Sequence, residues 1–258
     1  MTGLIGKAIV HADLRLVTGT RVGGSQGGLK IGGVDLNVIS DAWGRPYIPG
    51  SSLKGKLRSL LERKLNVRFS DRGVHSCRSA EDYNTCDICR IFGVLGGGIE
   101  APTLTRLVAR DAYLDETSIT DDMHSNLETQ FTEVKSETAI DRVRGTALQG
   151  SLRQVERVPA GAIFRPCEFV FNVFADADKD LFKQLFVAME LLEDDYLGGM
   201  GSRGYGKVAL ENLRVWWHSR QDYETGNVDV AQKTALNREF NTPRLLVANF
   251  DALKTSLA

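Results

Sequence analysis

The sequence has no long hydrophobic run and no strong charge imbalance. Its apolar stretches fall short of the roughly 20 residues that a membrane-spanning helix needs. The N-terminus alternates apolar and polar residues and lacks the apolar core of a signal peptide. The formal net charge of −1 does not mark the whole chain as a binder of polyanions. We therefore expect a cytoplasmic protein with no membrane partner. The local clustering of charged residues is a better guide to its binding partners than the net charge of the chain.

Cysteine is also scarce, with four residues in the chain. Disulfides are rare in the cytoplasm, so these cysteines are expected to be thiols or metal ligands. Three of them lie near a histidine in the sequence: His75, Cys77, Cys86 and Cys89. The Cys-x-x-Cys spacing lets two thiolates share one tetrahedral ion, and four protein ligands leave no open position on it. The pattern predicts a structural zinc site, with unrelated free thiols as the alternative, whereas Cys167 is expected in the core.

The apolar pattern predicts one α+β domain over residues 1–258, because no internal repeat or second core is visible. Amphipathic helices are expected at 51–65 and 178–195. Strands are expected at 4–17, 34–39, 104–114, 162–174 and 207–217, and a terminal helix near 228–240. Strand, helix, strands, helix, strand is the order of a ferredoxin-like or RRM-like βαββαβ sheet. Long insertions at about 66–100 and about 116–160 separate these elements.

The first predicted helix begins with a segment suited to phosphate binding. Residues 48–58 read Ile-Pro-Gly-Ser-Ser-Leu-Lys-Gly-Lys-Leu-Arg. Pro49 and Gly50 end the preceding strand, and Ser51 or Ser52 is expected to cap the helix. The free N–H groups of the first turn, the positive end of the helix dipole and Lys54 together favour a phosphodiester oxygen. The alternative is an ordinary capped helix with a solvated basic face.

Charge is segregated along the chain. Residues 51–68 carry six cations and one carboxylate, whereas residues 111–133 carry seven carboxylates and no Lys or Arg. A predicted projecting hairpin at about 135–160 is also basic, with Arg142, Arg144, Arg153 and Arg157. A basic stripe suits nucleic acid, and an acidic surface suits a partner subunit that presents basic groups.

Two glycine-rich segments stand out. The segment at 198–206 follows a helix and precedes a strand, which is the reverse of the order in nucleotide-binding loops and excludes an NTP site. Its glycines allow close approach of an RNA backbone beside Ser202, Arg203 and Tyr205, or else a tight helix-to-strand turn. Asp35 ends the other segment as a lone carboxylate. No neighbouring acid or histidine would form an acid–base pair with it. From composition alone, Asp35 is therefore expected to be a surface aspartate.

Together these motifs resemble the RAMP-type backbone subunit of type III CRISPR effector complexes, specifically the multi-copy Cas7-like subunit of the Csm-like branch. The resemblance spans most of the chain. It rests on the glycines at 19–24, residues 31–35, the helix motif at 48–58, Cys86 to Gly93, residues 140–142 with 156–159, and Leu197 to Val208. The chain departs from this family in two places. Many relatives have a histidine near Arg21, and their cysteine cluster is tighter.

The resemblance implies an RRM-like palm with a zinc-containing lid at about 66–100, and a flap and thumb hairpin at about 116–160. Copies of the palm would repeat as a filament along a guide RNA (crRNA). The implied RNA-binding residues are Arg21, Ser51, Ser52, Lys54, Lys56, Arg58, Arg142, Arg157, Ser202 and Arg203. Such contacts to phosphate and ribose set register and carry no sequence code.

The resemblance also implies catalysis and partners. Asp35 falls on the family's catalytic aspartate, which would promote attack of the target ribose 2′-hydroxyl on the adjacent phosphate and leave a cyclic phosphate. A divalent metal such as Mg²⁺ is the implied cofactor beside structural Zn²⁺. The implied partners are guide RNA, target RNA, other copies of the chain and other type III subunits, including the large polymerase-like one.

Two alternatives remain open at this point. The same architecture could serve as an RNA-binding scaffold without cleavage. A stand-alone zinc-containing metabolic enzyme that binds a phosphorylated substrate at the glycine-rich segment is the less expected alternative.

Overall fold

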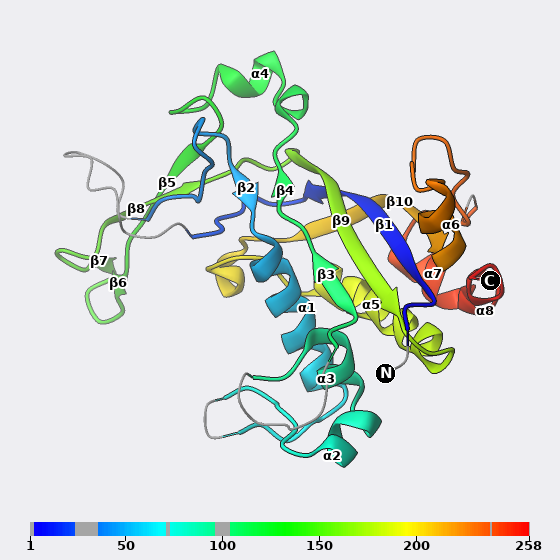
Figure 1. The fold of residues 1–258 in the computed structure, drawn as a ribbon. Coiled ribbons are helices and arrows are strands. Elements are labelled where there is room, and N and C mark those ends of the chain that lie inside the picture. The colour runs from blue at the N-terminus through cyan, green and yellow to red at the C-terminus, as the bar shows by residue number, and fades with distance from the viewer. Residues whose placement is uncertain (1–2, 24–35, 71–72, 96–103, 238, 258) are drawn as a thin grey trace.

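A four-stranded antiparallel sheet forms the centre of the molecule, in the order β10-β1-β9-β3 (Figure 1). The computed structural model describes residues 3–23, 36–70, 73–95, 104–237 and 239–257. The bounds of the strands are Gly6–Leu16 for β1, Leu107–Ala109 for β3, Ile163–Val173 for β9 and Val208–Ser219 for β10. The protein is therefore a mixed α/β fold built on an antiparallel sheet.

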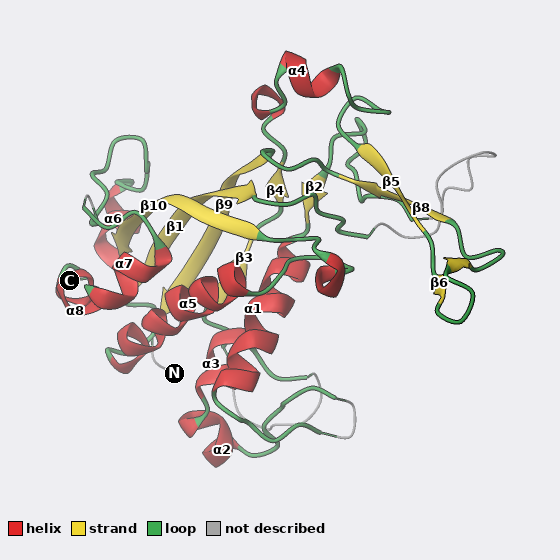
Figure 2. Cartoon of the chain, turned by 180° about the vertical axis from the view of Figure 1, so that it is seen from behind, coloured by secondary structure: helices red, strands yellow, loops and turns green. Residues whose placement is uncertain are grey.

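The core lies between one face of this sheet and two long helices. Every second residue of β1 from Ala8 to Leu16 is buried, as the alternation predicts. Helices α1 (Gly50–Lys64) and α5 (Ala177–Asp194) lie side by side over this face, in front of the strands in Figure 2. Burial of each leucine on the apolar stripe of α1 stabilises the fold by about 1.5–3 kcal/mol. Both predicted helices are confirmed within one residue at each end.

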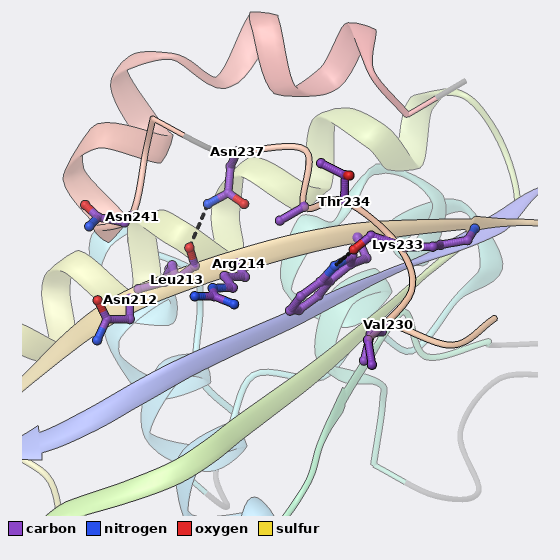
Figure 3. A pocket seen from close by; sticks show the side chains of 11 residues that line it. Asn212, Leu213, Arg214, Val230, Lys233, Thr234, Asn237 and Asn241 are labelled. Atoms are coloured by element: carbon purple, nitrogen blue, oxygen red, sulfur yellow. Dashed lines mark hydrogen bonds between the residues drawn. The ribbon is translucent and has the colours of Figure 1, made fainter.

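The C-terminal part of the chain covers the outer edge of β10. The Asn237 side chain accepts a hydrogen bond from the Val215 N–H (2.7 Å) and donates one to the Leu213 carbonyl (2.9 Å), as a neighbouring strand would. Figure 3 shows Asn237 above Leu213 at a pocket of about 520 Å³. The predicted helix near 228–240 is wrong. The described residues of this segment are not helical, and Asn237 instead forms hydrogen bonds with the backbone of β10. The terminal helices are α6 (Arg220–Thr225), α7 (Pro243–Ala248) and α8 (Phe250–Thr255).

Three appendages extend from the sheet and its helices (Figure 1). The first holds α2 (Ala80–Thr85) and α3 (Asp87–Phe92). The second holds the 3-10 helix η1 (Glu116–Ser118) and α4 (Asp121–His124), near a small sheet of β2 (Tyr47–Ile48) and β4 (Ala112–Tyr113). The third is the projecting hairpin of β5 (Glu133–Glu137) and β8 (Arg153–Arg157), with β6 (Ile140–Asp141) and β7 (Thr146–Ala147) at its tip.

Two sequence expectations are corrected by these elements. The predicted strand at 104–114 is divided into β3 and β4, because Arg110 and Asp111 interrupt it. Residues 36–39 form isolated bridges instead of a strand, and residues 34–35 lie outside the described part of the chain.

In the described part of the chain, every helix is too short or too polar to cross a lipid bilayer.

Candidate nucleic-acid interface and metal centre

The start of α1 differs from the sequence prediction in one respect. Pro49 is the N-cap, and no side chain caps the helix, so the expectation that Ser51 or Ser52 does so is wrong. The Gly50 N–H donates instead to Asp111 Oδ1 at 2.7 Å. Ser51 is exposed and Ser52 half-buried in the first turn. The N–H groups of Gly50, Ser52 and Leu53 thus already have partners, which leaves the Ser51 N–H and the serine hydroxyls of the first turn for a ligand.

The cations of α1 are tied to other parts of the protein. The Lys54 ammonium donates to the Leu107 carbonyl of β3 (2.8 Å), and burial lowers its pKa. The Lys56 ammonium pairs with Asp195 (3.1 Å) and lies 3.8 Å from the centre of the Tyr196 ring. These contacts anchor α1 to β3 and to the segment after α5, so both side chains are held in place at the edge of the sheet.

Arg58 is the most constrained of these cations. Its guanidinium pairs with Glu62 at 2.7 Å and donates to the carbonyls of Gly93 (3.1 Å) and His75. The side chains of Arg58 and Glu62 are 15% and 6% exposed. Arg58 therefore joins α1 to both ends of the appendage that holds α2 and α3, which is a structural role.

The glycines near residue 200 let two chain segments pack closely. The Gly199 N–H donates to the Arg21 carbonyl at 2.9 Å, and a Cβ at Gly198 would lie 2.3 Å from that same oxygen. Gly198 and Gly206 have φ values of +84° and +80°, which side chains disfavour. Burial lowers the pKa of the Arg21 guanidinium. Glycine is therefore needed in this segment partly because the backbone packs closely against residues 19–22.

Cations gather where this glycine segment meets the projecting hairpin. Lys135 Nζ and Arg157 Cζ lie 4.6 and 5.0 Å from the centre of the buried Tyr205 ring, within cation–π range. Burial, and then Glu137, raise the pKa of Tyr205 to about 12. Ser202 and Arg203 are exposed on the adjacent 3-10 helix η2 (Gly201–Arg203). The term basic cluster is used below for four side chains: Lys135, Arg153, Arg157 and Arg203.

Two carboxylates hold the basic cluster in place. Glu133 accepts a hydrogen bond from Arg157 at 2.7 Å. Glu137 pairs with Arg153 at 3.0 Å and with Arg203 at 3.4 Å, and so links the hairpin to η2. Four cations against two carboxylates leave the cluster with a net positive charge. Lys135, Glu137, Arg153 and Arg203 line a cavity of about 770 Å³ between η2 and the outer end of the β5–β8 ladder. This cavity is suited to a phosphodiester backbone.

Arg142 lies farther out than the basic cluster. It is exposed in the turn between β6 and β7, at the tip of the hairpin. The structure brings Arg157, Arg203 and the glycine segment together. In Figure 1 the start of α1 lies near the centre of the fold and the tip of the hairpin projects to the left, so these are separate positions.

Asp35 lies outside the described residues, but the chain that follows it is held at the base of the hairpin. Leu36 bridges to Val155 of β8, and its carbonyl accepts a hydrogen bond from the Glu156 N–H at 3.0 Å. The Val38 N–H donates to Glu156 Oε2 at 2.8 Å. The chain after Asp35 is therefore joined to the strand that carries two members of the basic cluster.

The predicted metal ligands come together in space. The ligand atoms of His75, Cys77, Cys86 and Cys89 all lie within 4.8 Å of one another. His75 Nε2 is 3.2 Å from Cys86 Sγ, while its Nδ1 is 2.8 Å from the Arg68 carbonyl, which orients the ring. A hydrogen bond from Cys89 holds the pKa of the Cys86 thiol down at about 4. Three thiols and one imidazole at this spacing match the donor set of a tetrahedral zinc site.

Comparison with known proteins gives the class of the chain. The model of the RAMP superfamily matches residues 13–209, so the chain belongs to the RAMP superfamily. Within it, the relatives carry one name, CRISPR system Cms endoribonuclease Csm3. The Methanocaldococcus jannaschii protein is 43% identical over 222 residues, which cover 86% of this chain and 85% of the relative. The Streptococcus thermophilus protein is 37% identical over 79% of this chain and 87% of its own length.

Solved structures show the same likeness. A chain of the Csm3–Csm4 subcomplex of a type III-A CRISPR-Cas interference complex is 33% identical, with a TM-score of 0.59, and the match covers 96% of this chain and 97% of that one. Csm3 of Methanopyrus kandleri is similar in fold, with a TM-score of 0.66 at 22% identity, over 99% of both chains.

Sequence reasoning missed three charged residues of this interface. Lys135, Glu137 and Arg153 are not among the predicted RNA-binding residues, although all three line the cavity. A signal was present, because Glu133 and Glu137 pair across the strands with Arg157 and Arg153. Oppositely charged cross-strand pairs that are an even number of residues apart lie on one face of a hairpin.

Proposed function

We propose that this chain is a guide-RNA-binding backbone subunit of a type III CRISPR ribonucleoprotein, which assembles as a filament along the guide and cleaves complementary target RNA. The single observation that carries this proposal is the basic cluster, three of whose members line a cavity beside the outer end of the β5–β8 ladder, in a chain whose relatives are named endoribonucleases. Its expected partners are guide RNA, target RNA, other copies of itself and other subunits of the complex.

The finer description of the fold belongs to this proposal. The order β1, α1, β3, β9, α5, β10 along the chain, with the sheet order β10-β1-β9-β3, supports a ferredoxin-like palm. We assign the lid to about residues 66–100 and the flap and thumb to about 116–160, as insertions in a single domain. The appendage with α2 and α3 and the projecting hairpin fall within these ranges.

The metal cluster is proposed to hold structural zinc. His75, Cys77, Cys86 and Cys89 would supply one imidazole and three thiolates. The appendage around them has few buried apolar residues of its own, among them Tyr83 and Ile88. Metal binding would therefore contribute folding free energy to the lid.

Cleavage is assigned to Asp35 by resemblance. The described chain that follows Asp35 is joined to β8, which also carries Arg153 of the cavity lining, and this supports a role of the segment in RNA contact. A divalent ion would supply charge stabilisation at the reacting phosphate when bound. A carboxylate beside the ribose would orient the 2′-hydroxyl and take up its proton, and a kinked backbone would allow the in-line geometry that regular A-form RNA denies.

The test is RNA binding over a range of salt concentrations. Arg203→Glu reverses a charge at the cavity, so it should weaken binding of single-stranded RNA and reduce the salt dependence by a slope of roughly 0.7 per lost phosphate contact. Arg214→Glu, at an exposed arginine on β10, is the matched control. Equal affinity and equal salt slope for wild type and Arg203→Glu would contradict the proposed interface.

The alternatives are less well supported. A scaffold without cleavage is not favoured, because the relatives are named endoribonucleases. A stand-alone metabolic enzyme is not favoured either, because the match to these relatives covers most of the chain.

A further inference from the structure

Trp43 is presented to solvent by a well-ordered turn. Its side chain is 83% exposed. Asp41 holds the turn, since its Oδ1 accepts hydrogen bonds from the N–H groups of Trp43 (3.0 Å) and Arg45 (2.9 Å). The Arg45 guanidinium lies 4.9 Å from the centre of the Tyr113 ring, which fixes the base of the turn on β4. Tryptophan is enriched among the residues that contribute most to binding at protein interfaces, and here it is carried on an anchored turn.

The surroundings of Trp43 are acidic. It shares a surface pocket with Arg45, which pairs with Asp41 at 3.1 Å, and with Glu116 of η1. No Lys or Arg occurs between Arg110 and Lys135 in the sequence. The exposed carboxylates of this acidic end are Glu116, Asp121, Asp122 and Glu128. Such a surface repels a phosphate backbone and attracts a protein surface that carries cations.

A complementary surface lies on the same chain, beside the metal cluster. A cavity of about 670 Å³ is lined by Arg68, Phe69 and Arg78, together with residues of the cluster and of α2. Phe69 is 45% exposed, and both arginines are exposed. The carboxylate among the described lining residues is Asp82 of α2. Two arginines against one carboxylate give the described lining of this cavity a net positive charge.

The two surfaces lie at opposite ends of the molecule. The Trp43 pocket includes η1 residue Glu116, next to α4, and the second cavity includes Asp82 and Thr85 of α2. Figure 1 places α4 and α2 at opposite ends of the fold. Trp43 and the cavity beside the metal cluster are different surfaces, so each copy can contact one neighbour at each end. Such contacts give an open, head-to-tail chain instead of a closed dimer.

We infer that a second copy of this chain is the occupant of the cavity beside the metal cluster, with Trp43 of one copy inserted between Arg68 and Arg78 of the next. The indole would pack on Phe69 and make cation–π contacts with the two arginines. The acidic end of one copy would face the positive mouth of the other. This inference deepens the filament of the proposed function and rests on it.

Sedimentation velocity of the full chain at increasing concentration tests this contact. Wild type should form species larger than a dimer. Trp43→Ala and Arg78→Glu each remove one side of the contact, so each should weaken self-association at least about tenfold, as for an interface hot spot. Arg214→Glu should behave as wild type, and zinc content per chain shows whether the cavity of Arg78→Glu is intact.

Mixing the two variants gives the sharper result. The Arg78→Glu copy retains Trp43, and the Trp43→Ala copy retains the cavity, so an equimolar mixture should form a one-to-one dimer and nothing larger. A monomeric wild type, a variant that assembles as wild type does, or a mixture that stays monomeric would overturn the inference. If the wild type self-associates but does not bind RNA, the proposed function is overturned instead.

Discussion

Replacement of Arg58 by alanine should destabilise the protein without removing an RNA contact. Arg58 pairs with Glu62 and donates to the carbonyls of Gly93 and His75, and both charged side chains are largely buried. Removing one partner of a buried ion pair costs about 3–5 kcal/mol, because the other charge stays buried and unpaired. For a chain of this size each kcal/mol lowers the midpoint of thermal unfolding by about 2–4 °C, so the expected shift is roughly 6–20 °C.

Thermal unfolding and RNA affinity should be measured on the same preparations. Arg63→Ala, at an exposed arginine on the same helix, is the control and should leave the midpoint nearly unchanged. The double variant Arg58→Met, Glu62→Leu should recover much of the lost stability, since neither charge is then left unpaired. Folded Arg58→Ala should bind RNA as wild type does. An unchanged midpoint together with weaker RNA binding would refute this reasoning and make Arg58 an RNA contact.

Three further changes have defined outcomes. Gly198→Ala places a Cβ 2.3 Å from the Arg21 carbonyl at a positive φ, so it should lower the unfolding midpoint, whereas Gly226→Ala, with a positive φ but open space around it, should be milder. Cys89→Ser, or chelation of wild type, should release one zinc ion per chain and increase proteolysis within residues 66–100; no bound zinc in wild type would contradict the metal site. Asn237→Leu leaves a buried N–H and carbonyl of β10 unpaired and should cost about 2–4 kcal/mol in urea unfolding, and unchanged stability would refute the edge-covering role.

The periodic parts of the fold were predictable because burial imposes its period on the sequence. Alternation in β1 and the leucine stripe of α1 gave elements with nearly correct bounds. The cysteine spacing predicted the ligand cluster, which the structure brings together. In both cases a local pattern carried the information.

Long-range partners were not predictable from local pattern. The N-cap of α1 was misassigned because Asp111, far along the chain, satisfies the Gly50 N–H. The segment around Asn237 was misread as a helix because its partner is the edge of β10. The two carbonyl partners of Arg58 likewise come from a distant appendage, whereas its pairing with Glu62 at i+4 is visible in the sequence of α1. A residue whose role is set by tertiary contacts cannot be identified from its neighbours in sequence.

The most direct test of the account is cleavage of a labelled RNA complementary to the guide, by assembled complexes that contain wild type or Asp35→Ala. Wild type should cut the RNA at regular intervals and leave cyclic phosphate ends, while Asp35→Ala should bind guide and target equally well and leave the target intact. Cutting at the wild-type rate by Asp35→Ala would contradict the assignment of catalysis to Asp35.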